Sequence, residues 1–193
     1  MVHIRIEDIE EYARVNHVPI MLKDGIDYMI NYIKNNNIKH ILEIGTAIGY
    51  SSIRMALVNE DITVTTIERD KSMFLKAKEN IGLFNLEKRI NVVYGDALEV
   101  ELNDKFELIF IDAAKSQYIK FFEKFKYNLS DTGSIITDNL DFHGLVKDST
   151  NCSRNTKQLV KKIQLYIDFL KSNSEFNTTF ISVGDGISVS KKI

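Results

Sequence analysis

Two apolar runs of the chain end on side chains that carry oxygen. The run FELIFI, residues 106–111, is followed by Asp112, and the run GSIIT, residues 133–137, is followed by Asp138 and Asn139. If the runs are neighbouring strands of one parallel sheet, about 4.8 Å apart, these side chains meet at one edge. Two carboxylates and an amide oxygen form an all-oxygen ligand set, which suits Mg²⁺ better than Zn²⁺. The spacing therefore indicates a Mg²⁺ site.

Each of these residues also has a simpler interpretation. Aspartate commonly caps a helix or forms a turn, and for Asp112 or Asp138 alone this interpretation is preferred. For the two together, with Asn139 attached, the metal interpretation is preferred. Lys115 follows Asp112 by three residues and, taken alone, is a solvated surface lysine.

A glycine turn points to a second ligand. In LEIGTAIGYS, residues 42–51, Gly45 and Gly49 allow a tight turn into a helix, and Glu68 follows Gly45 by 23 residues. An acidic residue at about this distance suits the hydroxyls of a ribose. The fingerprint G-x-G-x-x-G of diphosphate cofactors is missing from the sequence, so S-adenosylmethionine fits better than NAD. The simpler alternative is that the glycines merely turn the chain.

Hydrophobic periodicity divides the chain into alternating strands and helices. The expected strands are 40–45, 62–68, 89–95, 106–112 and 133–138, and the expected helices are 5–16, 24–36, 50–59, 71–84, 116–129 and 155–171. At the C-terminus, the runs 178–183 and 187–192 flank Gly184-Asp185-Gly186, a hairpin signal. The pattern predicts an α/β fold, with a mostly parallel seven-stranded sheet and a C-terminal antiparallel hairpin.

Composition limits the class of protein. The 193 residues carry a net charge of −2, which argues against binding nucleic acid through bulk charge. There is one cysteine, Cys152, so an internal disulfide is excluded. The sequence shows neither an apolar run of membrane-spanning length nor a signal peptide. We expect a cytoplasmic protein without a membrane partner, built as one domain over 1–193, with an N-terminal helical segment (1–37) and a catalytic core (38–193).

The motifs LEIGTAIGYS, TIERD, GDALE, FIDAAK and TDN, in this order, resemble the metal-dependent O-methyltransferases of the catechol and caffeoyl-CoA type. The resemblance implies a Rossmann-like fold, S-adenosylmethionine as methyl donor and Mg²⁺ as cofactor. It implies that Asp112, Asp138 and Asn139 hold the metal, and that Lys115 is the catalytic base beside Asp112. The cofactor-binding residues that follow from the motifs are Met21, Glu43, Gly45, Ser51, Glu68, Asp96, Ala97 and Asp112.

A narrower likeness concerns the methyl acceptor. VPIM, FIDAAKSQY, DNLDFHGLV and VGDGISVS resemble the bacterial tRNA 5-hydroxyuridine methyltransferases. This resemblance implies a tRNA partner and 5-methoxyuridine as product, and we expect a homodimer. The loop 140–153 is a candidate lid or substrate loop, with His143 as a loop or substrate contact rather than a metal ligand. The candidate RNA contacts on the last long helix are Arg154, Lys157, Lys161 and Lys162.

Four alternatives remain at this point, of which an NAD-dependent dehydrogenase is the most distant. The same chemistry can serve a small catechol-like phenol. The chain can also be a non-catalytic protein that binds S-adenosylmethionine. The basic residues of the last helix can form an ordinary solvated face.

Overall fold

The computed structural model describes residues 5–146 and 152–193. Two helices come first, α1 (Ile6–Val15) and α2 (Lys23–Asn35), close to the predicted ranges. Within α1, Ile9 and Ala13 are buried, and the carboxylate of Glu10 accepts a hydrogen bond from the hydroxyl of Tyr50 at 2.7 Å. The N-terminal segment is thereby attached to the helix that follows the glycine turn.

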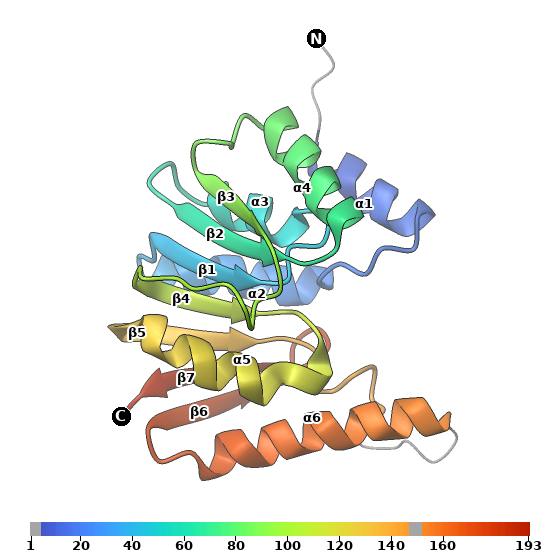
Figure 1. Cartoon of the computed structure of the whole chain (residues 1–193), viewed down its shortest axis with the longest axis vertical. Coiled ribbons are helices and arrows are strands. Elements are labelled where there is room, and N and C mark those ends of the chain that lie inside the picture. The colour runs from blue at the N-terminus through green and yellow to red at the C-terminus, as the bar shows by residue number, and fades with distance from the viewer. Residues whose placement is uncertain (1–4, 147–151) are drawn as a thin grey trace.

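The seven strands form one sheet in the order β3-β2-β1-β4-β5-β7-β6 (Figure 1). All neighbours up to β5 run parallel, and β7 runs antiparallel to β5 and to β6. The strands are β1 (His40–Ile44), β2 (Thr63–Glu68), β3 (Ile90–Tyr94), β4 (Phe106–Ile111), β5 (Leu129–Thr137), β6 (Phe176–Ile181) and β7 (Ile187–Lys192). The predicted fold class and closing hairpin are confirmed.

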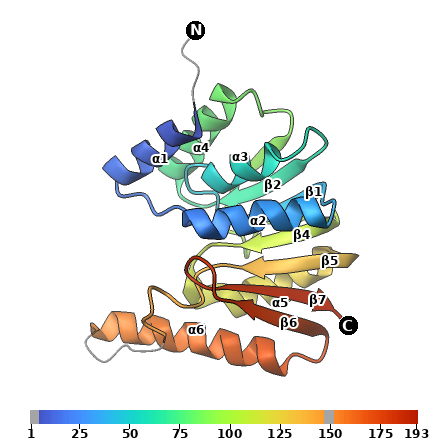
Figure 2. The same cartoon turned by 180° about the vertical axis from the view of Figure 1, so that it is seen from behind.

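Helices cover both faces of the sheet, as Figures 1 and 2 show from opposite sides. On β4, Leu108 and Phe110 join the buried cluster that includes residues of α2, α3 and α4, whereas Ile109 and Ile111 join the cluster of α5 and α6. A strand buried on both faces needs apolar residues at every position, which is why FELIFI reads as a nearly continuous apolar run. The helices here are α3 (Tyr50–Ala56), α4 (Lys71–Leu83), α5 (Tyr118–Phe125) and α6 (Arg154–Ser172).

The predicted helix 116–129 is divided in the structure. A 3-10 turn at Lys115–Gln117 precedes α5, and a second one at Lys126–Asn128 follows it. The strand β5 then begins at Leu129, four residues before the predicted start at 133. The cause is a break in register, since Leu129 pairs with Phe106 while Ser134 pairs with Leu108. Periodicity alone does not reveal such an irregularity.

In the described ranges, 5–146 and 152–193, we find no helix that is both long enough and apolar enough to cross a membrane. The predicted loop 140–153 is described only in part, because residues 147–151 lie outside the described ranges.

Candidate active site

Two cavities lie side by side at the carboxyl ends of the central strands. The larger one has a volume of about 390 Å³, and its wall includes Met21, Ser51 and Lys115. The smaller one has a volume of about 150 Å³, and its wall includes Glu68 and the 95–97 segment. Gly45, Ala47, Asp112 and Ala113 line both. The shared wall makes one elongated site, at the position where ligands bind in open α/β sheets.

Gly45 is required by a close approach of two backbone segments. Its φ is +100°, and a Cβ at this position would lie 2.2 Å from the backbone oxygen of Asp112. Gly49 has φ +82° and stands at the N-cap of α3. The glycine turn therefore lets β1 pass directly against the residue that ends β4, which brings the turn and Asp112 to the same wall.

Glu68 holds the glycine turn in place. One oxygen of its carboxylate accepts the N–H of Ala47 at 2.8 Å, and the other accepts the N–H of Asp70 at 2.8 Å. Ala47 has φ +46°, an uncommon conformation for a residue with a side chain. Glu68 is thus fixed at the end of β2, facing the smaller cavity.

Asp96 and Ala97 lie where the sequence placed them, beyond the end of β3 on the wall of the smaller cavity. The carboxylate of Asp96 accepts the N–H of Leu98 at 2.9 Å. Arg69 approaches the same carboxylate to 3.9 Å.

Glu43 is placed differently from the prediction. It is fully buried and lines neither cavity. Its carboxylate accepts hydrogen bonds from the hydroxyls of Ser51, Ser52 and Thr66, the last at 2.6 Å. Burial raises the pKa of Glu43 to about 7, against the effect of these hydrogen bonds. Because side chains of β1 alternate between the two faces, Glu43 points behind the cavity wall and reaches it through Ser51, and through Thr66, whose hydroxyl also bonds that of Thr46.

Asp112, Asp138 and Asn139 come together as predicted from their strands. The pairing of Ile111 with Thr137 in β4 and β5 sets the two aspartates side by side. Asp138 is 2% exposed, and its Oδ1 has no hydrogen-bond partner among the residues that the structure describes. Burial raises its pKa to about 7, and the negative charge of Asp112 adds to the rise.

Asp112 is partly buried, as its place on the wall of both cavities requires. Burial raises the pKa of its carboxyl group, against the opposing effect of the Lys115 ammonium. One buried and one partly buried carboxylate therefore concentrate negative charge at this edge, next to Lys115, and one oxygen of the buried carboxylate lacks a hydrogen-bond partner among the described residues.

Lys115 lies within the same cluster. Its Nζ donates a hydrogen bond to Oδ1 of Asn139 at 2.7 Å, and it stands 5.6 Å from the ring centroid of Phe142. The structure thus gives Lys115 a place in the larger cavity rather than on the solvated surface.

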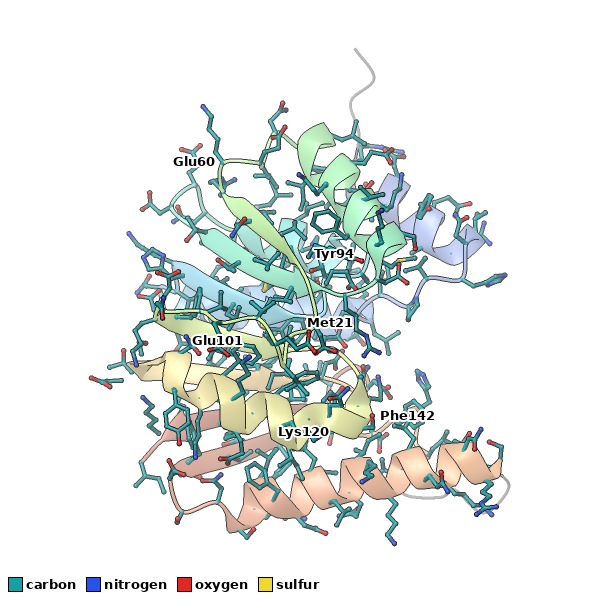
Figure 3. The ribbon with its side chains drawn as sticks, viewed as in Figure 1. Met21, Glu60, Tyr94, Glu101, Lys120 and Phe142 are labelled. Atoms are coloured by element: carbon teal, nitrogen blue, oxygen red, sulfur yellow. The ribbon has the colours of Figure 1, made fainter. Side chains whose placement is uncertain are left out.

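Two contributors to the site were not assigned a role in it from the sequence. Phe142, from the loop after β5, and Asp185, from the hairpin turn, line the larger cavity beside His143. Figure 3 shows Phe142 and Met21 beyond the carboxyl ends of the strands. The sequence signals for Asp185 were the pair of glycines around it, which predicts a turn, and its place in the motif VGDGISVS, which was given no role in the site.

The four basic residues of α6 do not line either cavity. Arg154, Lys157, Lys161 and Lys162 are all exposed. The first turns of α6 lie on the side of the molecule toward which the parallel strands point, the same side as the site (Figure 1).

Within the described part of the chain, no group of three or more His, Cys, Asp and Glu side chains is arranged to hold a metal ion. Besides Asp112 and Asp138, the oxygen-bearing side chain at this edge is the amide of Asn139, whose oxygen accepts from Lys115.

Comparison with known proteins gives the family. The family model described as O-methyltransferase matches residues 3–193. A solved structure from Staphylococcus aureus, provisionally named a caffeoyl-CoA O-methyltransferase, is 44% identical, covers 98% of this chain and 93% of its own, and superposes with a TM-score of 0.94.

Two further relatives agree. An O-methyltransferase from Bacillus cereus, solved in complex with SAH, is 25% identical over 97% of this chain and 90% of its own, with a TM-score of 0.82. A caffeoyl-CoA O-methyltransferase from Populus kitakamiensis is 26% identical over 98% of this chain and 85% of its own. The chain therefore belongs to the O-methyltransferase family and is an S-adenosylmethionine-dependent enzyme.

Proposed function

We propose that this enzyme methylates the 5-hydroxyl of 5-hydroxyuridine at the wobble position of tRNA, giving 5-methoxyuridine, and that it requires Mg²⁺. The requirement for Mg²⁺ is supported by one observation above all, the buried Oδ1 of Asp138 that lacks a hydrogen-bond partner among the described residues. A cation would satisfy that oxygen.

The residues present fit Mg²⁺. Asp112, Asp138 and Asn139 offer only oxygen ligands, as this hard ion prefers, and three protein ligands leave positions for water or substrate. When bound, Mg²⁺ would supply a Lewis acid that lowers the pKa of a hydroxyl chelated together with a neighbouring oxygen. The 5-hydroxyl and the O4 carbonyl of 5-hydroxyuridine are such a pair.

The side chains have separable roles in the transfer. Lys115 is held at the cavity wall by Asn139 and, in its neutral amine form, is placed to take the proton of the acceptor hydroxyl and so become an ammonium. Asp112 lines both cavities, so it lies between the place of the acceptor and that of the methyl donor. Ser51 and Met21 border the donor side of the larger cavity, with Glu68 placed for the ribose and Ala97 for the adenine. Much of the rate then comes from holding the oxygen in line with the methyl group and the sulfur.

The tRNA acceptor is supported by the sequence motifs on the loop after β5 and by the exposed basic residues of α6 at the same side of the molecule. The wobble base lies in a loop, so little unpairing is needed to reach the cavity. We propose a homodimer as the working unit, since a second copy would add a second basic surface for the RNA.

A small catechol-like phenol is the second candidate acceptor. It is favoured by the cavity of about 390 Å³, which is of a size that holds a small molecule. Binding of S-adenosylmethionine without catalysis is a more distant alternative.

The decisive experiment measures transfer of labelled methyl groups from S-adenosylmethionine. Undermodified tRNA and a panel of phenols are the acceptors, each with and without a chelator. We expect chelator-sensitive labelling of tRNA, and its loss in Asp112→Ala. Labelling of phenols alone would refute the tRNA acceptor, and chelator-resistant labelling would refute the requirement for Mg²⁺.

A further inference from the structure

The turn between β6 and β7 carries a buried carboxylate at the edge of the site. Asp185 is 4% exposed and lines the larger cavity. Gly184 and Gly186 on either side have φ values of +57° and +83°. A Cβ at position 186 would lie 2.8 Å from the backbone nitrogen of Asp141, and one at position 184 would lie 3.2 Å from Cα of Gly25. The turn therefore packs closely against the start of α2 on one side and against the loop after β5 on the other.

The turn also fixes that loop through three backbone donors. The N–H of Leu140 donates to the carbonyl of Gly186 at 2.9 Å, and the N–H of Asp141 donates to the carbonyl of Asp185 at 2.7 Å. The N–H of His143 donates to Oδ1 of Asp185. One carboxylate oxygen of Asp185 is thus committed to the loop that follows the proposed metal ligands.

The second carboxylate oxygen of Asp185 faces the side chain of Asn139. Nδ2 of Asn139 lies 3.3 Å from Oδ2 of Asp185 and 3.3 Å from Oδ2 of Asp138. At the other end of the amide, Oδ1 accepts from Nζ of Lys115 at 2.7 Å. The reversed amide would set its oxygen against two carboxylates and its NH₂ group against an ammonium. Only the first orientation pairs donors with acceptors at both ends.

We propose that Asp185 is a positioning residue for the cation site: its carboxylate holds the NH₂ group of Asn139, which keeps the amide oxygen on the cavity wall that Asn139 shares with Asp112 and Lys115. Asn139 has φ +62° and follows β5 directly, so this carboxylate and the hydrogen bonds of the turn fix both its backbone and its amide. Partners that orient a metal ligand in this way typically change metal affinity about 10–100-fold when they are lost. The inference rests on the proposed use of Mg²⁺ at this site.

The first variant is Asp185→Asn in the full-length chain. Its single side-chain oxygen can still accept the N–H of His143, but its NH₂ group then faces the NH₂ group of Asn139. Mn²⁺ alone is the probe, without S-adenosylmethionine or RNA, and its binding is measured by titration calorimetry and electron paramagnetic resonance. We expect the dissociation constant for Mn²⁺ to rise about tenfold or more. Asp131→Asn, at a fully exposed position, is the matched control.

Removal of a negative charge would weaken cation binding by itself, so a swap separates charge from orientation. The double variant Asn139→Asp with Asp185→Asn keeps the net charge of the site and reverses the donor and the acceptor of the pair. We expect it to bind Mn²⁺ at least about fivefold more tightly than the product of the two single effects predicts, because the pair is restored.

The outcomes distinguish this inference from the proposed function. If wild type fails to bind Mn²⁺, both the metal site and the role of Asp185 are overturned. If wild type binds Mn²⁺ but Asp185→Asn binds equally well, or the two substitutions are additive, only the role of Asp185 is overturned. If Asp185→Asn does not fold by circular dichroism, the swap decides alone. If the double variant binds Mn²⁺ within about threefold of wild type, the result supports the pairing of Asp185 with Asn139. Weaker binding of Mn²⁺ by the double variant, or its failure to fold, overturns that pairing.

Discussion

Gly45 lies where the backbone of β1 passes against the backbone that follows β4. A Cβ added at this position would lie 2.2 Å from the backbone oxygen of Asp112, which leaves no room for any side chain. The backbone conformation, with φ +100°, also excludes other residues. The shape of the site therefore depends on the absence of a side chain at position 45.

We therefore expect Gly45→Ala to weaken binding of S-adenosylhomocysteine at least about 100-fold, because either the turn or Asp112 must move and both line the site. Titration calorimetry measures the change. Gly82→Ala is the control, since Gly82 lies in α4 and the nearest atom to its Cβ would be 3.5 Å away. That helical glycine should gain stability and bind the ligand normally. Equal binding by Gly45→Ala and wild type would contradict the proposed approach of the ligand to this turn.

Glu43 makes the stability of the chain depend on pH. Its pKa rises from the ordinary value of 4.5 to about 7 on folding, so the folded state binds more protons than the unfolded state between these values. The contribution of Glu43 to the free energy of unfolding is therefore greatest below pH 4.5, and it falls as the pH rises toward about 7. The loss above pH 7 is on the order of 3 kcal/mol at most, at about 1.4 kcal/mol for each pH unit.

The variant Glu43→Gln removes this titration but keeps an acceptor for the hydroxyls. We expect it to be more stable than wild type at pH 8, by about 1–3 kcal/mol, and of similar stability near pH 4.5. Urea denaturation at the two pH values measures the difference. Loss of stability in the variant at pH 8 would show that the charged form of Glu43 is the one that the fold stabilises.

At the scale of elements, the register of β4 against β5 sets Asp112 beside Asp138, and α6 carries exposed basic residues on the same side of the molecule. Ile111 pairs with Thr137, so the next residue on each strand is an aspartate at the same edge. On α6, Ser153 caps the N-terminus by accepting the N–H of Thr156 at 3.2 Å, and Ile163 and Tyr166 are buried. The buried face fixes which residues of α6 point outward.

Lys157 and Lys161 are one helical turn apart on the exposed surface of α6. The double variant Lys157→Glu with Lys161→Glu should weaken binding of undermodified tRNA about tenfold or more. It should also reduce the salt dependence of binding, because a complex with fewer phosphate contacts releases fewer counterions when it forms. Filter binding across several salt concentrations measures both quantities. The control is Lys34→Glu with Lys88→Glu, two exposed lysines near the amino ends of the strands. An equal loss in both double variants would assign the effect to net charge rather than to α6.

At the scale of the whole molecule, the site joins segments from across the chain. The linker before α2, the turn after β1, the ends of β4 and β5 and the hairpin turn all contribute to one cavity wall. A ligand that contacts these segments together stabilises the folded chain as a unit, since the unfolded chain offers no such constellation.

Mg²⁺ should therefore raise the thermal midpoint of the chain. At one hundred times its dissociation constant the added stability is about 2.7 kcal/mol, which corresponds to roughly 5–10 °C for a domain of this size. The variant Asp138→Ala should abolish the shift. Without metal it should also lose the cost of a buried, unpaired carboxylate oxygen, so its own midpoint should not fall far. Calorimetric scans with Mg²⁺, and with chelator, measure both effects, and an unchanged shift in Asp138→Ala would exclude this residue as a ligand.

Local sequence determined the elements and the chemistry of the strand ends. The apolar runs, the glycine turn and the paired glycines of the hairpin predicted the strands, the sharp turn and the antiparallel edge, because periodicity and backbone freedom act over a few residues. The placement of Asp112 beside Asp138 also followed, since neighbouring parallel strands end at one edge. The motifs further identified the family.

The tertiary structure alone decided which of these polar groups touch each other. Glu43 belongs to the same motif as Gly45, yet it lies behind the wall and binds Ser51. Asp185 is 46 residues from Asn139 in sequence, yet the two side chains meet. Such contacts depend on the order of the strands in the sheet and on the face to which each side chain points. They form only when the sheet and the helices on both of its faces have assembled, because no local propensity encodes a contact between distant segments.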